Sequence, residues 1–281
     1  MGHGMYRLGY LGPPGTFSEV AAHRYSEGKN YELVECSSLE NIFRGVASGI
    51  LEEGLVPVEN STEGSVGIVF DLLAGPFDLA VRGEVLLPVT HSLLVRPGVA
   101  LSKIEKVLSH PQALAQCRGL LQKELPNVDW QECSSTAAAA VLVARQERHW
   151  GALAPAAAAR VYGLDVLIPE ANDCPHNVTR FFAIGREQLP CFGDRCKTSL
   201  VFGVCDHPGT LYLVLREFAL RGINLTRIES RPAKKRLGEY IFFLDFTGSS
   251  ADPSVQDLLG TLSRITTGLK LLGSYYYSSS F

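Results

Sequence analysis

The sequence predicts an α/β protein of two lobes, followed by a smaller α+β domain. Short apolar runs alternate with stretches of helical periodicity over the first two-thirds of the 281 residues, which is typical of parallel sheets covered by helices. Two longer strand-like runs interrupt this alternation around residues 79–96, where we expect the chain to cross into the second lobe. After an aperiodic stretch at 185–197 the expected order is strand, helix, strand, strand, helix, strand.

The first lobe is expected to contain three strand–helix units. They are a strand at 7–11 with a helix from about 17, a strand at 32–36 with a helix from about 39, and a strand at 54–58 with a helix at 66–73. The crossing runs are 79–87 and 89–95, with Pro88 between them.

The second lobe repeats the alternation. Its expected strands are 106–109, 128–132 and 151–154, and its expected helices are 112–123, 136–144 and 156–161. The strand that carries Thr179 then returns to the first lobe, so two crossings should join two sheets with a cleft between them.

The stretch 185–197 contains Pro190 and Gly193 and is the best candidate for a linker. Beyond it we expect strands at 198–205, 224–230, 240–246 and 269–276, and helices at 210–221 and 254–261. This order is that of a ferredoxin-like split βαβ unit.

Charge and composition exclude several classes of protein. The 26 basic and 29 acidic residues give a net charge of -3 without long blocks of one sign, so nucleic acid is not an expected partner. The longest apolar run, 137–144, is far below the roughly 18 residues of a spanning helix, and no signal peptide is evident. We therefore expect no membrane association and a cytoplasmic location.

The seven cysteines are scattered and include no C-x-x-C pair, which suits reduced thiols in the cytoplasm. We expect the two closest, Cys191 and Cys196, to be ordinary thiols.

The most informative motif is C-P-H-N-V-T-R-F-F at 174–182. Arg180 can bind a carboxylate with its guanidinium fork, and Thr179 can reach the same ligand with a hydroxyl. The same alternation also fits an ordinary half-buried strand. The motif indicates an anionic small molecule as ligand.

Two further motifs, G-P-P-G-T-F-S-E at 12–19 and P-V-E-N-S-T-E-G-S-V at 57–66, each follow an expected strand. All three motifs resemble those of the prephenate dehydratase family, and the chain beyond 197 resembles its regulatory ACT domain. The resemblance covers nearly the whole chain. It implies a bilobal, periplasmic-binding-protein-like catalytic domain at 5–187, with lobe 1 at about 5–80 and 172–187 and lobe 2 at about 81–171, and an ACT domain at 197–278. Because no chorismate mutase or dehydrogenase segment is evident, we expect a monofunctional enzyme.

The resemblance implies a decarboxylating dehydration of prephenate to phenylpyruvate that needs no metal and no cofactor. Catalytic roles fall on Thr179, Glu132, Gln116 and Ser109. Substrate contacts fall on Thr16, Glu59, Asn60, Ser61, His110, Asn177, Arg180 and Phe181.

Several of these assignments have alternatives. Thr16, with Glu19 three residues on, also fits a helix cap, and His110 also fits a structural histidine. Arg180 also fits a structural ion pair. Thr179 could donate a proton or only position the substrate. Since Phe181 and Phe182 alternate across the strand, we expect one in the core and the other at the pocket.

The motifs D-H-P-G-T-L-Y at 206–212 and G-I-N-L-T-R-I-E-S-R-P at 222–232 resemble the two phenylalanine-binding motifs of the ACT domain. The resemblance implies effector contacts at Gly209, Thr210, Leu211, Asn224, Leu225, Glu229 and Ser230. Thr210 and Tyr212 are bulkier than the residues of the family's G-A-L-V form. Such sites lie between two ACT domains, so a homodimer or homotetramer is expected, with phenylalanine as allosteric effector.

Two other functions stay open. Arogenate, which carries an ammonium in place of the side-chain ketone, could be the substrate. A non-catalytic cytoplasmic sensor of small anions is the second alternative; a group of Thr179, Glu132, Glu59 and Asn60 at one cleft would argue against it.

Overall fold

The structure is a computed structural model that describes residues 5–174, 176–234 and 239–277. Pro175 of the motif at 174–182 and Ser278, the last residue of the predicted second domain, lie outside the described residues. The chain forms two compact units. The first consists of Met1–Ile42, Leu55–Val66 and Leu86–Phe181, and the second of Phe43–Gly54, Gly67–Val85 and Phe182–Phe281.

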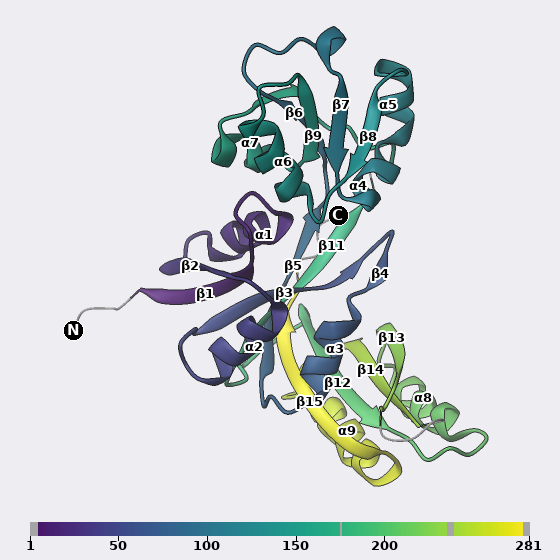
Figure 1. The fold of residues 1–281 in the computed structure, drawn as a ribbon. Helices are drawn as coiled ribbons and strands as arrows, with labels where there is room; N and C mark the ends of the chain where they lie inside the picture. Colours follow the sequence, from purple (N-terminus) through teal and green to yellow (C-terminus); the bar gives the residue numbers. More distant parts are fainter. Residues whose placement is uncertain (1–4, 175, 235–238, 278–281) are drawn as a thin grey trace. The chain divides into compact units, whose positions relative to one another are not determined.

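The first sheet has the strand order β2-β1-β3-β11-β5, with the short β4 paired to β3 (Figure 1). Its strands are β1 (Tyr6–Leu11), β2 (Tyr31–Cys36), β3 (Glu53–Asn60), β4 (Gly64–Ser65), β5 (Ala80–Pro88) and β11 (Val178–Gly185). The helices between them in sequence are α1 (Phe17–Ser26), α2 (Leu39–Ala47) and α3 (Gly67–Ala74). Because β3 and β11 are neighbours, Asn60 meets Thr179 although 119 residues separate them.

The second sheet has the order β10-β6-β9-β7-β8. Its strands are β6 (Ser92–Val95), β7 (Lys106–Ser109), β8 (Asp129–Glu132), β9 (Trp150–Ala154) and β10 (Asp165–Ile168). β7 is parallel to β8 and β9, but β6 is antiparallel to β9 and β10. The sheet is therefore mixed and not parallel as predicted. Only a loop with the 3-10 turn Leu101–Lys103 joins β6 to β7, which lies beyond β9 in the sheet, and a β7 parallel to β6 would need a longer crossover.

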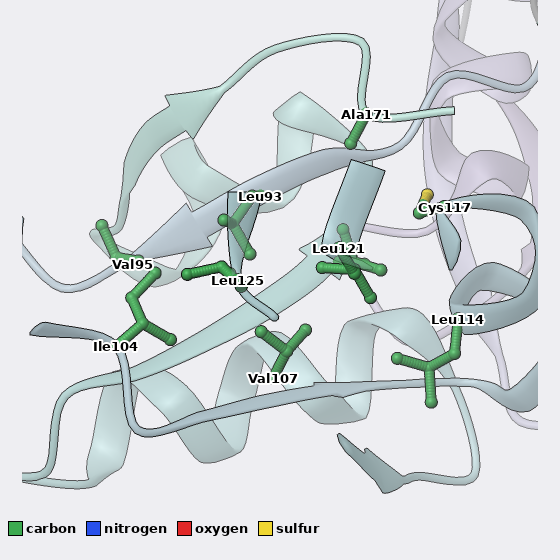
Figure 2. Close-up of a cluster of buried hydrophobic side chains, with 10 residues drawn as sticks. Leu93, Val95, Ile104, Val107, Leu114, Cys117, Leu121, Leu125 and Ala171 are labelled. Atoms are coloured by element: carbon green, nitrogen blue, oxygen red, sulfur yellow. The ribbon is translucent and has the colours of Figure 1, made fainter. Parts of the chain in front are cut away.

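Both faces of the second sheet are covered by helices (Figure 1). These are α4 (Pro111–Gln116), α5 (Arg118–Glu124), α6 (Thr136–Arg145) and α7 (Ala156–Tyr162). Leu93 and Val107 pack into one core cluster with residues of α4 and α5, as Figure 2 shows. Their direct neighbours Leu94 and Leu108 pack with α6 and α7 on the opposite face. Successive strand residues point to opposite faces, which explains why these strands are apolar throughout.

The single helix expected at 112–123 is interrupted at Cys117, where the backbone leaves helical geometry at φ -115° and ψ 12°. The interruption gives α5 an N-terminus of its own. The Asp173 carboxylate accepts hydrogen bonds there from the amides of Gly119 (2.7 Å) and Leu120 (2.9 Å). Capping by a distant carboxylate thus stabilises two short helices in place of one, and no local pattern indicates it.

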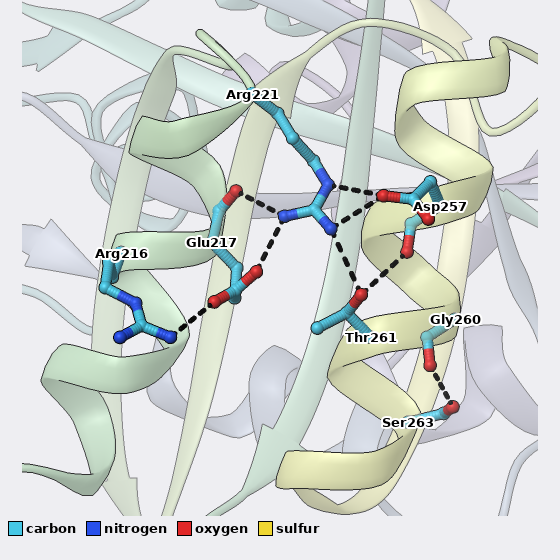
Figure 3. Close-up of polar contacts among 7 residues, drawn as sticks. All are labelled: Arg216, Glu217, Arg221, Asp257, Gly260, Thr261 and Ser263. Carbon is cyan, nitrogen blue, oxygen red and sulfur yellow. Dashed lines mark hydrogen bonds and ion pairs between the residues drawn. The ribbon is translucent and has the colours of Figure 1, made fainter.

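The third sheet has the order β13-β14-β12-β15, and its paired strands are antiparallel. Its elements are β12 (Cys196–Gly203), α8 (Thr210–Leu220), β13 (Leu225–Pro232), β14 (Tyr240–Thr247), α9 (Pro253–Ile265) and β15 (Thr267–Tyr276). The predicted α/β class with a βαββαβ unit is confirmed. Arg221, just after α8, joins the two helices of this unit by donating to Glu217 and to Asp257 on α9 (Figure 3).

The expectation that Cys191 and Cys196 are ordinary thiols is wrong, because they form a disulfide. The segment between Gly185 and Cys196 returns to the start of β12, where the two sulfur atoms meet, and the five-residue spacing alone does not reveal this turn. Within the described part of the chain, the helices are too short or too polar to cross a bilayer.

The buried cluster of Figure 2 predicts a graded loss of stability. Leu121 is fully buried there, whereas Leu142 on α6 is 37% exposed. Leu121→Ala should lower the free energy of unfolding by about 2–5 kcal/mol because it removes buried methyl groups and leaves a cavity. Leu142→Ala should cost under about 1 kcal/mol.

Urea unfolding followed by tryptophan fluorescence measures both changes. The chain has only two tryptophans, Trp130 and Trp150, and both lie on strands of the second sheet. Equal losses for the two variants would contradict this description of the core.

Candidate active site

A cavity of about 470 Å³ lies within the first compact unit. Its walls come from the end of β3, β4, the start of β11, the segment before β6, α4 and the beginning of α6. The lining residues are Phe17, Asn60, Glu63, Gly64, Ser65, Val66, Val89, His91, His110, Gln112, Ala113, Gln116, Ser134, Ser135, Thr136, Asn177 and Thr179. Five residues predicted for the site are thus brought together: Asn60, His110, Gln116, Asn177 and Thr179.

Asn60 is central to the polar wall of the cavity, by which we mean the hydrogen-bonded lining residues Asn60, Thr179, Asn177, Gln116 and His91. Its Oδ1 atom accepts hydrogen bonds from the backbone amides of Thr62 (3.0 Å) and Glu63 (3.1 Å). A backbone N–H can only donate, so these two bonds decide which end of the side-chain amide is oxygen. Its Nδ2 atom then points the other way and donates to Asn177 Oδ1 (2.7 Å) and Thr179 Oγ1 (2.8 Å).

Thr179 stands near the start of β11, where its hydroxyl oxygen accepts the bond from Asn60. The hydroxyl hydrogen finds no acceptor among the described residues. Since Thr179 lines the cavity, this hydrogen is available to a ligand there. The geometry makes Thr179 a hydrogen-bond donor toward the cavity.

The orientation set at Asn60 continues through two more amides. Asn177 accepts from Asn60 with its oxygen, so its Nδ2 donates to Gln116 Oε1 (2.9 Å). Gln116 Nε2 in turn faces Thr62 Oγ1 (3.1 Å) and the Glu63 carboxylate (3.5 Å). Each amide therefore has one allowed orientation.

His91 ends this chain of hydrogen bonds. Its Nε2 atom lies 3.2 Å from Gln116 Oε1, which is an acceptor, so the proton of the neutral ring must be on Nε2. Its Nδ1 atom is then an acceptor, and it is buried without a partner among the described residues. Burial lowers the pKa of His91 to about 4, although the bond to Gln116 acts in the opposite direction.

His91 is a site residue that the sequence analysis missed; the histidine assigned to the substrate there is His110. It belongs to none of the recognised motifs and stands just before β6 in an apolar run. Glu63 was missed as well, although it lies inside the motif at 57–66 and is the only carboxylate among the described lining residues. The same lining holds no Lys or Arg.

Helix N-termini supply positive potential to this wall in place of cationic side chains. α6 begins at the cavity, where Ser134, Ser135 and Thr136 line it and Ser135 caps the helix by accepting from the Ala138 amide (3.0 Å). The first amides of a helix favour an anion. On α4, His110 Nδ1 accepts from the Gln112 amide (3.4 Å), which is the structural role considered as its alternative.

Two residues predicted to be catalytic lie away from the cavity lining. Ser109 is fully buried at the end of β7, and its hydroxyl donates to the Leu153 carbonyl (2.6 Å). Glu132 is exposed on β8, paired in register with Ser109. Their proximity to a substrate stays a prediction.

The aromatic and charged members of the T-R-F-F run also lie outside the lining. Phe181 and Phe182 are each 1% exposed, so the prediction that one of them faces the pocket is wrong. β11 lies inside its sheet between β3 and β5, where side chains on both faces are covered. Arg180 is buried, with its guanidinium 4.0 Å from the Glu59 carboxylate. This is the structural ion pair that was considered as the alternative for Arg180.

The two remaining residues predicted to contact the substrate, Thr16 and Ser61, form hydrogen bonds with the main chain. Thr16 caps α1, accepting from the Glu19 amide (3.4 Å), while Glu19 accepts from the Gly15 amide (2.6 Å). This fits the helix cap considered for Thr16, with the difference from a standard capping box that Glu19 binds the amide one residue before the cap. The Ser61 hydroxyl bridges the His176 carbonyl (3.2 Å) and the Val178 amide (3.0 Å), and so holds the start of β11 beside Asn60.

The predicted effector residues fall into two groups. Gly209, Thr210 and Leu211 line a cavity of about 350 Å³ at the start of α8. The other four, Asn224, Leu225, Glu229 and Ser230, do not line it. The Glu229 carboxylate is 3.2 Å from the Arg227 guanidinium on the same strand.

Comparison with known proteins gives a consistent result. Residues 8–189 match the family described as prephenate dehydratase, and residues 198–264 match the ACT domain. The chain is 41% identical to the prephenate dehydratase of Methanocaldococcus jannaschii, covering 95% of this chain and 96% of that protein. It is 40% identical to the bifunctional chorismate mutase/prephenate dehydratase of Aquifex aeolicus (96% and 73% covered). It is 39% identical to arogenate dehydratase 2 of Petunia hybrida (96% and 71%).

Two solved structures are similar over most of the chain. The prephenate dehydratase of Arthrobacter aurescens in complex with L-Phe superposes with a TM-score of 0.90 at 37% identity, covering 96% of this chain and 90% of that one. A protein described as GqqA, a novel type of quorum quenching acylase, gives a TM-score of 0.88 at 31% identity (97% and 98%). One fold can support different activities, so the groups that line the cavity, and not the fold alone, determine the reaction.

The buried imidazole of His91 predicts a pH dependence of stability. Its pKa in the native state is about 4, against 6.5 for an ordinary histidine, so between these values the unfolded chain binds a proton that the native state does not. Stability should be full above pH 6.5 and fall on acidification, with a total loss of about 3 kcal/mol complete below about pH 4.

Replacing His91 by Gln should remove this contribution, and replacing the exposed His23 by Gln should not. Urea unfolding between pH 7 and 4, together with NMR titration of the imidazoles, measures it. A His91 titration near pH 6.5 in the native protein would contradict the burial described here.

Proposed function

Because the chain belongs to the prephenate dehydratase family, we propose that its cavity binds prephenate and converts it to phenylpyruvate in the synthesis of phenylalanine. In this carbon–oxygen lyase reaction the ring carboxylate leaves as carbon dioxide and the ring hydroxyl as water, and formation of the aromatic ring drives the step. The protein has to orient two carboxylates and assist the departing hydroxyl.

The observation that carries this proposal is the donor state of Thr179. Its oxygen is already occupied by the Asn60 amide, so a hydroxyl in the cavity can meet only its hydrogen. A hydrogen bond from this group to the departing oxygen would stabilise the charge that develops there. A threonine hydroxyl is a weak acid, so we assign Thr179 to hydrogen bonding and positioning, and not to complete proton transfer.

The described lining of the cavity contains no Lys or Arg, so other groups have to bind the two carboxylates of the substrate. The N-terminus of α6, with the hydroxyls of Ser134 and Thr136, is the part of the wall that favours negative charge. Glu63 stands elsewhere on the wall, where its carboxylate accepts from Gln112 Nε2 (2.6 Å). We propose that α6 binds one carboxylate of prephenate and that Glu63 repels it from the wrong orientation.

Arogenate remains the alternative substrate, because relatives named arogenate dehydratase are as similar as several named prephenate dehydratase. The alternative of a sensor without chemistry is opposed by Thr179 and Asn60, which line the cavity together. Glu132 and Glu59, which the sequence analysis places at the same cleft, do not line it. Appearance of phenylpyruvate absorbance from prephenate is the direct test, and its absence would favour the sensor.

Thr179→Val tests the donor role, since valine keeps the shape and removes the hydroxyl. We expect kcat for prephenate to fall by about 100-fold or more, with the fold intact, because one transition-state hydrogen bond is lost. Thr179→Ser keeps the hydroxyl and should retain most of the activity. Steady-state kinetics and thermal unfolding measure both variants; a near-normal kcat for the valine variant would refute the role.

We further propose that phenylalanine is a feedback inhibitor that binds at the start of α8. Gly209 precedes this helix and no side chain caps it, so its first amides are free of side-chain partners in the described structure and suit an amino-acid carboxylate. The ammonium group would be bound by Glu229 or Asn224, which lie outside this cavity, and a second copy of the chain would supply them. The edge strand β13 carries both the Glu229 carboxylate and an exposed Ile228, which supports a homodimer or a homotetramer built from it.

Gly209→Ala tests the effector site. Gly209 has φ +86°, which disfavours any residue with a Cβ atom, although the space around it is open. The variant should lose inhibition by phenylalanine and keep its basal turnover. Gly163→Ala is the matched control, because Gly163 also has positive φ and open surroundings but ends α7.

Turnover with and without phenylalanine, and calorimetric binding of phenylalanine, measure the effect. Wild-type kinetics that do not respond to phenylalanine, together with no binding, would refute the regulatory proposal.

The domain limits 5–187 and 197–278 and the cytoplasmic location stay proposals. Five described cysteines are free thiols, as expected of a reducing compartment, but the Cys191–Cys196 bond is an exception to that reasoning.

A further inference from the structure

We propose that Arg231 couples the proposed phenylalanine site to the catalytic cavity by acting on α3. This inference rests on the proposed function, and it names the side chain through which the effector changes the binding of prephenate. Arg231 is a positioning residue in this role, since it lies on β13 and lines neither the catalytic cavity nor the cavity at the start of α8.

The first support is the place of Arg231 on its strand. β13 is an edge strand that carries three of the predicted effector residues, Leu225, Glu229 and Ser230, and Arg231 directly follows them. Successive residues of a strand point to opposite faces, so Ser230 and Arg231 point to opposite faces of the third sheet. A shift of β13 that begins at one face therefore also displaces the side chains on the other.

The second support is the contact between Arg231 and α3, which belongs to the same compact unit as the third sheet. The Arg231 Nε atom donates to the Asp71 carboxylate (3.1 Å). The guanidinium also covers the start of the helix, where a Cβ atom at Gly67 would lie only 2.7 Å from Nη1 and 2.8 Å from Nη2. Arg231 thus contacts two successive turns of α3, and it can approach so closely because residue 67 has no side chain.

Other contacts fasten the middle and the end of α3 to the same sheet. The Phe70 ring packs edge-on against Phe243 of β14, with centroids 4.9 Å apart, and the Arg227 guanidinium lies 4.2 Å from the centroid of the Phe70 ring. Lys270 on β15 donates to the Leu73 carbonyl (3.2 Å) near the C-terminus of the helix. The helix is therefore anchored in the sheet, and the arginine of the edge strand reaches its first turn.

The third support is the chain connection between α3 and the catalytic cavity. Residues 64–66 line the cavity, and the next residue, Gly67, is the first of α3. Gly64 is also paired with Asn60 between β3 and β4. A displacement of the first turn of α3 is therefore passed through one peptide bond to the cavity wall and to the side chain that orients Thr179.

Feedback regulation needs two states in which the effector makes different contacts. Phenylalanine bound at β13 and at the start of α8 shifts the edge strand, and Arg231 transmits the shift to Asp71 and to the first turn of α3. The wall formed by residues 64–66 moves with that turn, and the affinity for prephenate falls.

Arg231→Gln tests this coupling, because glutamine removes the guanidinium while Asp71 keeps its bond from Lys234. In the wild type, saturating phenylalanine should raise the KM for prephenate by about 5-fold or more, the usual range of allosteric coupling. In Arg231→Gln this factor should fall below about twofold. The calorimetric Kd for phenylalanine, the kcat without effector and the Tm should stay close to those of the wild type, which separates coupling from binding and folding.

Lys234→Gln is the matched control, since Lys234 donates to the same Asp71 carboxylate (2.7 Å) from a more exposed position. It should keep the wild-type response to phenylalanine. Gly67→Ala is a second test that leaves both members of the Arg231–Asp71 pair in the chain. Its methyl group displaces the guanidinium from the start of α3, so the response should fall as in Arg231→Gln. The fold should be retained, because the end of a long side chain can move aside.

The outcomes separate this inference from the proposals on which it rests. Wild-type protein that does not turn over prephenate, or whose turnover does not respond to phenylalanine, refutes those proposals and the inference with them. If the wild type responds, an unchanged response in Arg231→Gln overturns the inference alone. If that variant does not fold, a wild-type response in Gly67→Ala overturns it.

Two further results would also overturn the coupling role. Loss of phenylalanine binding in Arg231→Gln would assign Arg231 to the effector site itself. An equal loss of response in Lys234→Gln would show that the charge around Asp71 matters, and not the contact of Arg231 with the start of α3.

Discussion

The two backbone amides that bind Asn60 Oδ1 are the constraint on which the polar wall of the cavity depends. Thr62 and Glu63 follow Asn60 at the end of β3, so a local turn fixes the orientation of one side-chain amide. That orientation then determines which atoms of Asn177, Gln116 and His91 donate and which accept. The donor that Thr179 offers to the cavity is thus decided by main-chain geometry at some distance from it.

Strand and helix positions could be predicted from the sequence where local physics decides them. Period-two and helical patterns place most elements within a few residues, because apolar faces must be buried wherever the chain goes. The predictions that were wrong concern features that depend on partners distant in the sequence. The break at Cys117 requires the Asp173 carboxylate, the direction of β6 depends on how its sheet is entered, and the Cys191–Cys196 bond depends on a turn.

The candidate site shows the same division. Asn60 is the last residue of β3 and Thr179 lies near the start of the neighbouring β11. Motif residues at these strand ends meet at the cavity, as their position in the sequence predicts. Phe181 and Ser109 are equally close to motifs, yet the strand directs their side chains into buried surroundings, which a motif does not reveal. His91 has no motif around it. It acquires its importance only from Gln116 and Asn172, which approach it from other parts of the chain.

Residues 171–173 and 177 connect the second sheet to the first. Ala171 and Asn172 are bonded to the backbone of His91, Asp173 holds the beginning of α5, and Asn177 bonds to Asn60 before β11 starts. These four residues therefore tie elements of the second sheet to the first. The Asp173 amide also donates to the carbonyl of Gln116 (2.8 Å), which lines the cavity. Weakening the hold of Asp173 on α5 would therefore loosen the alignment of Gln116 through the main chain, without removing a side chain from the cavity.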